Sequence, residues 1–493
     1  MLFPGQPSPE LNMAGQSMHF DVIIVGGGPA GYPLAISLAR QKLKVALIEK
    51  RAELGGVCLH NGCIPSKTII GAAEILNEAR RAKSYINSSD ALSVDWPSLQ
   101  VHKNQVVDTL ANGVRHLLKK AGAEVFQGTA SFVDGHSLRI EQESGETVVT
   151  GNRIVIATGS RTRVPAEWEN KQGLITSEEL VHLDKLPESL AIVGGGVIGC
   201  ELGSAFARFG VKVSIVEMEQ RILPPFEKEQ SQHLERAIKE SGIELHLGTS
   251  VKSWESKSDK AKLELADGTK IAAELVLVAI GRVGNTESLH LENAGVAVNG
   301  AGFVTCDDSY RTTAESIYAI GDVNGHSMFA HAATAQAHRL SHILMGQAAE
   351  PLTAIPECVY TMPEIASIGM HEEDAVREQI PMEVGTFRYD YLGRALAGNH
   401  GDGFFKTIHE TGTGKLIGLH IYGQHATELI HAGMAMINSS DSPEQIARYI
   451  WAHPTLSEGI GEAILSSFNL SINTPFKIAS SVKGQEIVFE LGS

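Results

Sequence analysis

The sequence is poor in the residues that mark several classes of protein. Five cysteines in 493 residues are too few for a disulfide scaffold, which favours a reducing compartment. No apolar run approaches the length of a membrane span. The first twenty residues contain neither lysine nor arginine, so they predict no secretory signal and no transit peptide but a tail. Basic residues are outnumbered, 41 against 57 acidic ones, which argues against nucleic-acid binding and favours an acidic cytoplasmic protein.

Glycine, in contrast, is abundant. Fifty glycines against eighteen prolines predict many tight turns and close backbone approaches rather than disorder. A chain of 493 residues is also too long for a single hydrophobic core, so two to four domains are expected.

The first glycine cluster lies in "DVIIVGGGPAGYPLAISLARQKLKVALIEK". A short apolar run, Val22 to Val25, leads into Gly26, Gly28 and Gly31, and a second run ends on Glu49. This order predicts a strand, a tight turn, a helix and a second strand. Glycines let the backbone approach a pyrophosphate, and the acid binds a ribose hydroxyl.

The same design recurs in "LAIVGGGVIGCELGSAFARFGVKVSIVEME". Gly194, Gly196 and Gly199 follow an apolar run, and Glu217 ends the next one. The acid follows the first glycine by 23 residues in both copies. One such motif is weak evidence, but two complete copies with equal spacing predict that the chain binds two dinucleotides.

Three further apolar runs end in glycine turns: "IVIATGS" (154–160), "LVLVAIGR" (275–282) and "SIYAIGDV" (316–323). The first two mark points where the chain passes between the nucleotide-binding units. The third is predicted to end on Asp322, which either binds a sugar-like hydroxyl chain or is a turn aspartate. From about residue 355 the pattern changes to that of an antiparallel sheet with helices.

The segment "GGVCLHNGCIPSK" places Cys58 and Cys63 five positions apart. Zinc would need two more soft ligands nearby, and there are none. A structural bridge over four residues would gain little loop entropy. A redox-active pair remains, and it follows Glu49 closely enough to lie beside the first nucleotide. Cys200, Cys306 and Cys358 are isolated and are read as buried small hydrophobes.

The segment "HPTLSE" allows two interpretations. Thr455 and Glu458 have the spacing of a capping box, in which case His453 is incidental. Beside a reactive dithiol, an imidazole lowers a cysteine pKa and a carboxylate fixes its tautomer. Three histidines, His331, His338 and His342, also share a helical face, which we expect to be solvated rather than metal-binding.

These motifs together resemble the flavin-dependent pyridine nucleotide–disulfide oxidoreductases, and among them most closely the dihydrolipoyl dehydrogenases. The resemblance runs from about Asp21 to about Pro475 and rests on "GGGPAG", "GGVCLHNGCIPSK", "ATGS", "GGGVIG", "AIGRVGNT", "YAIGDV" and "HPTLSE". It implies that Cys58 exchanges with substrate and Cys63 faces the flavin, while His453 is the acid–base and Glu458 orients it. Glu201 would pair with Lys67 close to the flavin.

The resemblance also implies two cofactor sites. The residues expected to bind FAD are Gly26, Gly28, Pro29, Ala30, Gly31, Glu49, Lys50, Gly56, Val57, Cys58, Lys67, Ala130, Thr158, Gly159, Ser160, Asp322, Met328, Phe329, Ala330 and His331. Those expected near NAD are Gly194, Gly196, Val197, Ile198, Gly199, Glu201, Glu217, Val251 and Gly281. No metal is expected.

The expected fold class is α/β, with two Rossmann-like dinucleotide-binding domains and a C-terminal α+β dimerisation domain. The predicted boundaries are 1–20 for the tail, 21–160 and 282–354 for the FAD-binding part, 161–281 for the NAD domain, 355–475 for the dimerisation domain and 476–493 for an extension. The resemblance implies a homodimer in which His453 and Glu458 of one chain complete the cysteine site of the other.

The implied reaction is oxidation of dihydrolipoamide on a lipoyl domain, with NAD+ as acceptor, as in 2-oxo acid dehydrogenase complexes built on an E2 core. Alternatives are a soluble pyridine nucleotide transhydrogenase, which "GRVGNT" and "GCEL" resemble, and a glutathione-reductase-like enzyme. Gln336-Ala337 also stands where dihydrolipoyl dehydrogenases usually have Glu-Gly. A binding module without redox activity is disfavoured by the intact cysteine pair and the His453/Glu458 pair.

Overall fold

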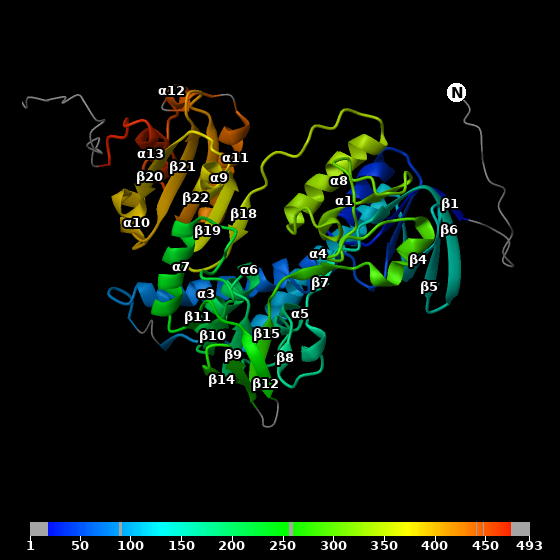
Figure 1. The fold of residues 1–493 in the computed structure, drawn as a ribbon, viewed down its shortest axis with the longest axis horizontal. Coiled ribbons are helices and arrows are strands. Elements are labelled where there is room, and N and C mark those ends of the chain that lie inside the picture. Colours follow the sequence, from blue (N-terminus) through cyan, green and yellow to red (C-terminus); the bar gives the residue numbers. More distant parts are fainter. Residues whose placement is uncertain (1–17, 88–90, 256–259, 440, 447, 475–493) are drawn as a thin grey trace, which may run out of the picture. The chain divides into compact units, whose positions relative to one another are not determined.

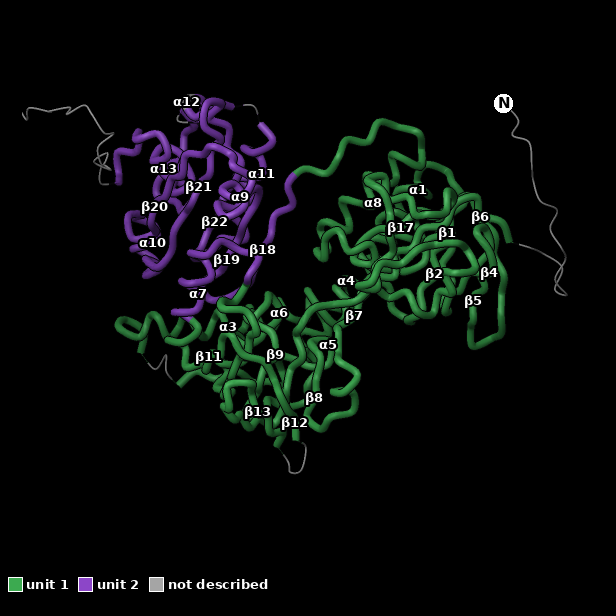
Figure 2. The backbone as a smooth tube through the Cα atoms, viewed as in Figure 1, with its two compact units in different colours: residues 1–223, 238–353 green, residues 224–237, 354–493 purple. Residues whose placement is uncertain are grey.

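The computed structural model describes residues 18–87, 91–255, 260–439, 441–446 and 448–474. They form two compact units (Figure 2): the first from residues up to 223 and from 238–353, the second from 224–237 and from 354 onward. The predicted extension 476–493 and all but the last three residues of the predicted tail lie outside the described residues.

The first unit contains a sheet around the first glycine motif (Figure 1). Its strand order is β3-β2-β1-β6-β5-β4, and β17 pairs with β6. Strand β1 starts at Met18, four residues before the predicted start, because Met18 to Phe20 continue the pairing with β6. The strands are β1 Met18–Val25, β2 Val45–Glu49, β3 Glu124–Gln127, β4 Thr129–Asp134, β5 Ser137–Gln142, β6 Gly145–Ile156 and β17 Ile317–Ala319.

Helices cover this sheet because its parallel strands are apolar on both faces. Leu34 and Leu38 of α1 pack with Val22 and Ile24 of β1 in one buried cluster. The helices of this part are α1 Gly31–Arg40, α2 Gly56–His60, α3 Cys63–Arg81, α4 Trp96–Ala121 and α8 Ala330–Leu344.

A second sheet in the same unit is built around the second glycine motif, with the all-parallel order β11-β10-β9-β15-β8. Smaller antiparallel sheets, β12-β13-β14 and β16-β7, accompany it. The strands are β7 Ser160–Thr162, β8 Leu174–Ile175, β9 Ser189–Val193, β10 Lys212–Val216, β11 Glu244–His246, β12 Val251–Glu255, β13 Ala261–Leu265, β14 Lys270–Ala273, β15 Leu275–Val278 and β16 Arg282–Gly284, with helices α5 Ser177–Leu180 and α6 Val197–Arg208.

The second unit is a five-stranded antiparallel sheet, β18-β19-β22-β21-β20, with α11 packed on β19 and β22 and α13 packed on β20 and β21. Helix α7 belongs to it up to residue 237. Its elements are α7 Lys228–Glu240, β18 Glu357–Val359, β19 Glu364–Gly369, α9 Glu372–Arg377, β20 Met382–Arg388, α10 Gly393–Ala397, β21 Phe404–Glu410, β22 Leu416–Gly423, α11 Ala426–Asn438, α12 Pro443–Ile446 and α13 Glu458–Ser467.

The predicted fold class is therefore confirmed: a mixed sheet whose strands β3, β2, β1, β6 and β17 are parallel and an all-parallel sheet, each with a glycine turn, are followed by an α+β domain. Residues 224–237 lie inside the predicted range 161–281 but pack with the C-terminal unit. Among the described residues, no helix has both the length and the apolar character needed to span a bilayer.

Candidate active site

The two glycine turns are built alike. A side chain at Gly26 would place its Cβ 2.2 Å from the carbonyl oxygen of Ala157, and one at Gly31 would lie 1.8 Å from that of Gly26. The second turn repeats this, with 2.3 Å at Gly194 and 2.0 Å at Gly199. These separations are far shorter than any real contact, so only glycine permits the helix to start this close to the strand.

The two acids occupy equivalent places. Glu49 accepts hydrogen bonds from the backbone nitrogens of Gly27 (2.7 Å) and Arg51 (2.9 Å). Glu217 accepts from those of Gly195 (2.6 Å) and Glu219 (2.8 Å). Each carboxylate thus holds its glycine turn in place, and its remaining lone pairs can accept hydroxyl hydrogens of a ribose.

The turns leave room for a nucleotide. A Cβ at Gly196 would meet no atom within 4 Å, and the same holds at Gly159 and Gly281. At Gly28 the nearest atom is the Cα of Gly56, 3.7 Å away. Space beside a helix N-terminus that points its N–H groups outward suits a pyrophosphate, so the residues present fit two dinucleotides. Val197 and Ile198 lie in the first turn of α6.

Thr158 to Ser160 meet Asp322 and two residues that the sequence did not single out. The hydroxyl of Ser160 donates to Asp322 Oδ2 (2.6 Å) and accepts from Arg282 Nε (2.6 Å). The Thr158 hydroxyl donates to the carbonyl oxygen of Asn285 at 2.8 Å. Asp322 lies in a short helical turn after β17, not at the strand end as predicted. In the sequence, the feature that points to Arg282 and Asn285 as site residues is their position just after the glycine turn at Gly281.

Gln336 departs from the pattern of the dihydrolipoyl dehydrogenases, and the structure shows what it does. Its side chain is buried, and its Oε1 accepts from the backbone nitrogen of Gly321 (2.7 Å) and from Asn324 Nδ2 (3.1 Å). Both contacts need only an acceptor oxygen. An amide therefore replaces a carboxylate here without leaving a donor unpaired.

The remaining residues predicted for the FAD and NAD sites are scattered. Ala130 is buried in β4, Lys50 is exposed after β2, and Val251 begins β12. Met328 and Phe329 precede α8, while Ala330 and His331 begin it.

His331, His338 and His342 are all exposed, as expected of a solvated face. Of the isolated cysteines, Cys200 is fully buried, but Cys306 and Cys358 are only partly buried, so the reading as buried hydrophobes holds best for Cys200.

The two predicted redox cysteines flank a short loop. Cys58 lies in α2 and Cys63 is the first residue of α3. The hydrogen bond between the two sulfurs raises the pKa of Cys58, and burial raises it further. The same bond lowers the pKa of Cys63, and the Lys67 ammonium adds to this despite burial. When the dithiol loses one proton, that proton therefore comes from Cys63.

The surroundings of the pair contain one ion pair and one tyrosine. Lys67 Nζ lies 2.8 Å from Oε2 of Glu201, which is 4% exposed, so the expected pairing is present. Burial raises the pKa of Tyr32, and the Cys58 sulfur adds to the shift. Tyr32 was not predicted; its signal is its position directly after the last glycine of the first motif.

In the second unit, His453 and Glu458 form a pair. Nδ1 of His453 lies 2.8 Å from Glu458 Oε2, and the other carboxylate oxygen accepts from the backbone nitrogen of Thr455 at 2.6 Å. Only half of the predicted capping box forms: Glu458 accepts from the Thr455 backbone nitrogen, but the Thr455 hydroxyl donates to the carbonyl oxygen of Ala452, and α13 begins only at Glu458. The His453 side chain is 76% exposed, so its Nε2 is free to meet a substrate.

Comparison with known proteins places this arrangement in a family. Residues 20–337 match the model of the pyridine nucleotide-disulphide oxidoreductases, and residues 355–464 match the dimerisation domain of the same family. The chain belongs to this family. The match to a dimerisation domain supports the predicted homodimer.

Relatives cover nearly the whole chain. A dihydrolipoyl dehydrogenase of Bacillus subtilis is 36% identical over 472 residues, which are 92% of this chain and 99% of that protein. A mitochondrial dihydrolipoyl dehydrogenase of Arabidopsis thaliana is 34% identical, covering 92% and 91%. Among solved structures, LpdA from Mycobacterium tuberculosis superposes with a TM-score of 0.84 at 25% identity, covering 91% and 99%. The HOCl-induced flavoprotein disulfide reductase RclA from Escherichia coli superposes with a TM-score of 0.82 at 29% identity, covering 90% and 99%.

Family membership makes the chain an enzyme, a flavoprotein oxidoreductase that uses FAD and NAD. The glycine turns, the two acids and the cysteine pair are the parts that such an enzyme needs. All of them lie in the first unit.

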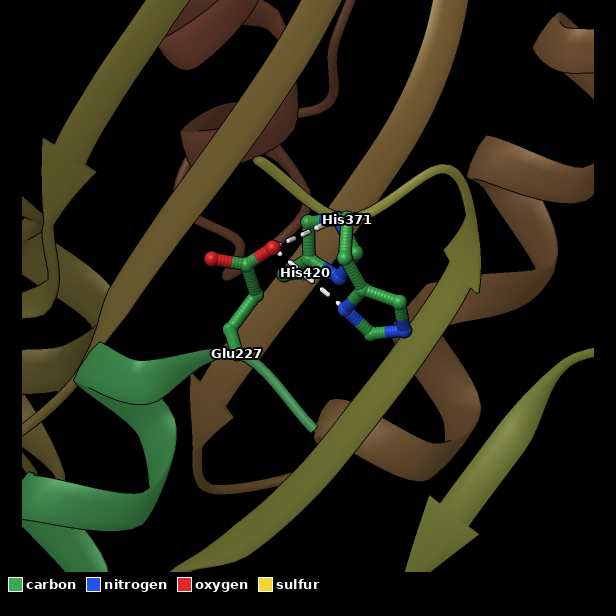
Figure 3. Close-up of side chains that lie close together, drawn as sticks. All are labelled: Glu227, His371 and His420. Carbon is green, nitrogen blue, oxygen red and sulfur yellow. Dashed lines mark ion pairs between the residues drawn. The ribbon is translucent and has the colours of Figure 1, made fainter. Parts of the chain in front are cut away.

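The second unit of this family member also contains a buried charged cluster (Figure 3). Glu227 Oε1 lies 3.3 Å from Nδ1 of His371 and 3.7 Å from Nε2 of His420, and its Oε2 lies 2.8 Å from Nζ of Lys406. Lys406 also contacts Glu229 at 3.3 Å. These contacts tie the segment 224–237 to the C-terminal sheet.

Glu227, His371 and His420 have the residue types of a metal site, and within the described part of the chain they alone bring three such ligand atoms within 4.8 Å of one another. However, Lys406 already supplies a cation to the carboxylate, and Nε2 of His420 donates to the carbonyl oxygen of Met370 at 3.0 Å. We therefore read the cluster as an ion pair between Glu227 and Lys406 beside two histidines, of which His420 is uncharged at neutral pH. Burial alone would raise the pKa of Glu227, but its contacts with the histidines and Lys406 outweigh burial and lower it.

This cluster predicts that the second unit loses stability in acid. Burial lowers the pKa of His420 from 6.5 to about 3. Between these two pH values His420 is therefore protonated in the unfolded chain but not in the folded one. The associated stability is complete above pH 6.5 and falls as the pH drops towards 3. At 1.36 kcal/mol per pKa unit, roughly 3 kcal/mol is lost by pH 4. The lowered pKa of Glu227 acts in the same direction below its ordinary value of 4.5.

Hydrogen exchange of peptides from β21 and β22, followed from pH 7 to pH 4, measures this loss. A His420→Gln chain should show a flatter pH dependence than the wild type, whereas His431→Gln, an exposed histidine in α11, should not. Equal pH dependence in all three chains would contradict the assignment.

Proposed function

We propose that this chain is a dihydrolipoyl dehydrogenase, which oxidises dihydrolipoamide to lipoamide and reduces NAD+ to NADH. The observation that carries the proposal is the placement of the cysteine pair: Cys58 in α2 and Cys63 at the start of α3 follow the first glycine turn, and Lys67 beside them pairs with buried Glu201 at 2.8 Å. A dithiol–disulfide exchange enzyme needs one sulfur that meets substrate and one that holds the charge. The names of the relatives supply the substrate class.

The exchange follows from the chemistry of thiols. His453 takes the proton of one substrate thiol, because the thiolate is the nucleophile that attacks a disulfide. The thiolate attacks Cys58 Sγ, a bond between substrate and Cys58 forms, and the Cys58–Cys63 bond breaks with Cys63 leaving as thiolate. The second substrate thiol then attacks the first substrate sulfur and closes lipoamide, and its proton passes to the departing Cys58.

The products of this exchange match the protonation preferences of the pair. Cys58 ends as a thiol, Cys63 as a thiolate beside Lys67, and His453 as an imidazolium held by Glu458. FAD, when bound at the first glycine turn, supplies the two-electron chemistry that links the dithiol to NAD+. The NAD-binding residues are those of the second turn, with Glu217 at the ribose.

Steady-state assays test the proposal. Purified protein is given dihydrolipoamide with NAD+, reduced glutathione with NADP+, or NADPH with NAD+. We expect NADH formation with dihydrolipoamide to exceed the other two rates by orders of magnitude. A higher rate with glutathione, or in the NADPH-to-NAD+ exchange, would assign the chain to one of the alternative activities instead.

We also propose the finer assignments. The substrate is carried by a lipoyl domain of a 2-oxo acid dehydrogenase complex, and the enzyme works in the cytoplasm, which its low cysteine content and acidic charge support. The domain boundaries at 160, 281, 354 and 475 and the assigned FAD and NAD residues belong to the same proposal.

The nucleotide preference is a prediction of its own. Glu217 accepts from two backbone nitrogens and faces the place of the ribose, with Glu219 exposed two residues on. A carboxylate accepts from a 2′-hydroxyl but repels a 2′-phosphate. We expect kcat/KM to be about 10²-fold higher with NAD+ than with NADP+. The Glu217→Gln substitution should reduce this ratio. Comparable efficiency of the wild type with both nucleotides would contradict this.

A further inference from the structure

Helix α4 contains a buried lysine. The Lys103 side chain is fully buried, and its Nζ donates to the carbonyl oxygen of Val181 at 2.8 Å and to Nδ1 of His182 at 3.0 Å, besides contacting Gln100. No carboxylate of the described residues pairs with it. A buried ammonium with only neutral acceptors is costly, and burial accordingly lowers the pKa of Lys103 to about 8.

The contacts continue from Lys103 to the redox site. Nε2 of His182 lies 3.1 Å from the carbonyl oxygen of His60 and 3.0 Å from the side-chain amide of Asn61. His60 and Asn61 are two of the four residues that separate Cys58 from Cys63. The buried lysine is therefore two hydrogen bonds away from the centre of the loop between the cysteines.

The Asn61 amide fixes the centre of this stretch of chain. In the orientation that places no donor against a donor, its oxygen accepts from Arg51 Nη1 at 3.0 Å, and its nitrogen donates to the carbonyl oxygen of His60 and contacts Nε2 of His182, each at 3.0 Å.

The ionisable groups that face the chain of contacts are His60 in the loop, Arg51 after β2 and Glu178 of α5, which lies 3.5 Å from Arg51. Burial and the Lys103 charge both lower the pKa of His182, which keeps this ring neutral.

We propose that Lys103 and His182 are positioning residues for the redox pair, holding the loop between the cysteines in the shape that favours the dithiol. The proposal rests on the proposed function of the pair. A disulfide requires Cα atoms about 4.4–6.8 Å apart and a fixed torsion, and the end of α2 with the two residues that follow it, anchored at His60 and Asn61, controls how readily that geometry is reached. Both cysteines are free in this structure, so the contacts described are those of the dithiol form.

Removing the anchor should therefore shift the equilibrium towards the disulfide. We expect His182→Ala and Lys103→Met each to change the dithiol–disulfide equilibrium constant by about tenfold, which is ~30 mV for this two-electron couple. His182→Gln keeps a donor and an acceptor, so its equilibrium constant should stay close to that of the wild type. The wild-type constant should also change with pH around 8, the pKa of Lys103, and Lys103→Met should lack this step.

The experiment equilibrates the FAD-loaded enzyme with dithiothreitol buffers of defined oxidised-to-reduced ratio, from pH 6.5 to 9. Free thiols are then alkylated and counted by mass spectrometry on the peptide that contains residues 55–67. Matched controls are Lys120→Met on the exposed side of α4 and His102→Ala, an exposed histidine next to Lys103. Both should titrate like the wild type. The count does not depend on turnover of dihydrolipoamide.

The outcomes separate the two proposals. A tenfold shift in both variants, with FAD retained and the controls unchanged, supports the positioning role. If the wild-type pair cycles but both variants titrate within twofold of it, the positioning role is wrong and the proposed function stands. If the wild-type pair never forms a disulfide in any buffer, the proposed function fails and the positioning role fails with it.

Discussion

A Cys63→Ser chain is expected to bind FAD and to be reduced by NADH, yet to lose dihydrolipoamide oxidation by about 10³-fold or more. Cys63 is the sulfur that holds the negative charge of the dithiol, since the bond from Cys58 lowers its pKa. A serine in its place cannot form the disulfide that substrate attacks. The long-wavelength absorbance expected of a thiolate against oxidised flavin should disappear as well.

Absorbance spectra and steady-state rates measure both effects. Cys306→Ser is the matched control, because burial raises the pKa of Cys306 to about 11 and its thiol has no assigned part in the reaction. It should behave like the wild type. If the Cys63→Ser enzyme turns over dihydrolipoamide at the native rate, the cysteine pair has a structural role and not a redox role.

The second large effect concerns the dimer. The family resemblance implies that His453 and Glu458 of one chain serve the cysteines of its partner. General acid–base assistance is typically worth about 10²–10⁴-fold in rate, so His453→Ala and Cys58→Ser homodimers should both be nearly inactive. After subunit exchange, a mixed dimer has one intact site and one site with both defects. We expect up to half of the native activity per mixed dimer.

A mixture of Cys58→Ser with Cys63→Ser controls for exchange itself. Both cysteines come from the same chain, so every site of that mixed dimer carries one defect and no activity should appear. If exchange is confirmed by mass and the first mixture stays as inactive as its parents, each site is completed within a single chain.

The features that the sequence could predict are those set by local geometry. At Gly26 and Gly194 no other residue fits the turn, so the motif and the structure correspond position by position. His453 and Glu458 are five residues apart, and their contact needs only one turn of chain. The separation of Cys58 from Cys63 is equally local.

The features that escaped prediction depend on residues that the fold brings together. Nothing in the sequence links Lys103 to Asn61, because their connection runs through His182, 79 residues beyond Lys103. One signal was available: Lys103 occupies the apolar stripe of α4, four residues before buried Val107. A lysine on such a stripe needs buried acceptors, but only the fold shows that residues 181 and 182 supply them.

Residues 224–237 were missed for a similar reason. They form a polar segment after the second nucleotide motif, yet Gln230 is fully buried and its Nε2 donates to the carbonyl oxygens of Ala366 and Ile421, each at 3.0 Å. These partners lie 136 and 191 residues further along the chain. Sequence patterns report local structure, and this contact is not local.

This discontinuous unit restricts how the gene can be recombined. A chimera that takes codons 354–493 from one homologue and the remainder from another inherits Lys406, Ala366 and Ile421 from one parent but Glu227 and Gln230 from the other. If the parent of the remainder lacks those two side chains, Lys406 keeps Glu372 of its own segment but loses the buried carboxylate of Glu227, and two buried carbonyl groups lose the amide that donates to them, which costs several kcal/mol. A chimera that preserves the unit therefore needs three crossover points: one on each side of residues 224–237 and one near residue 354.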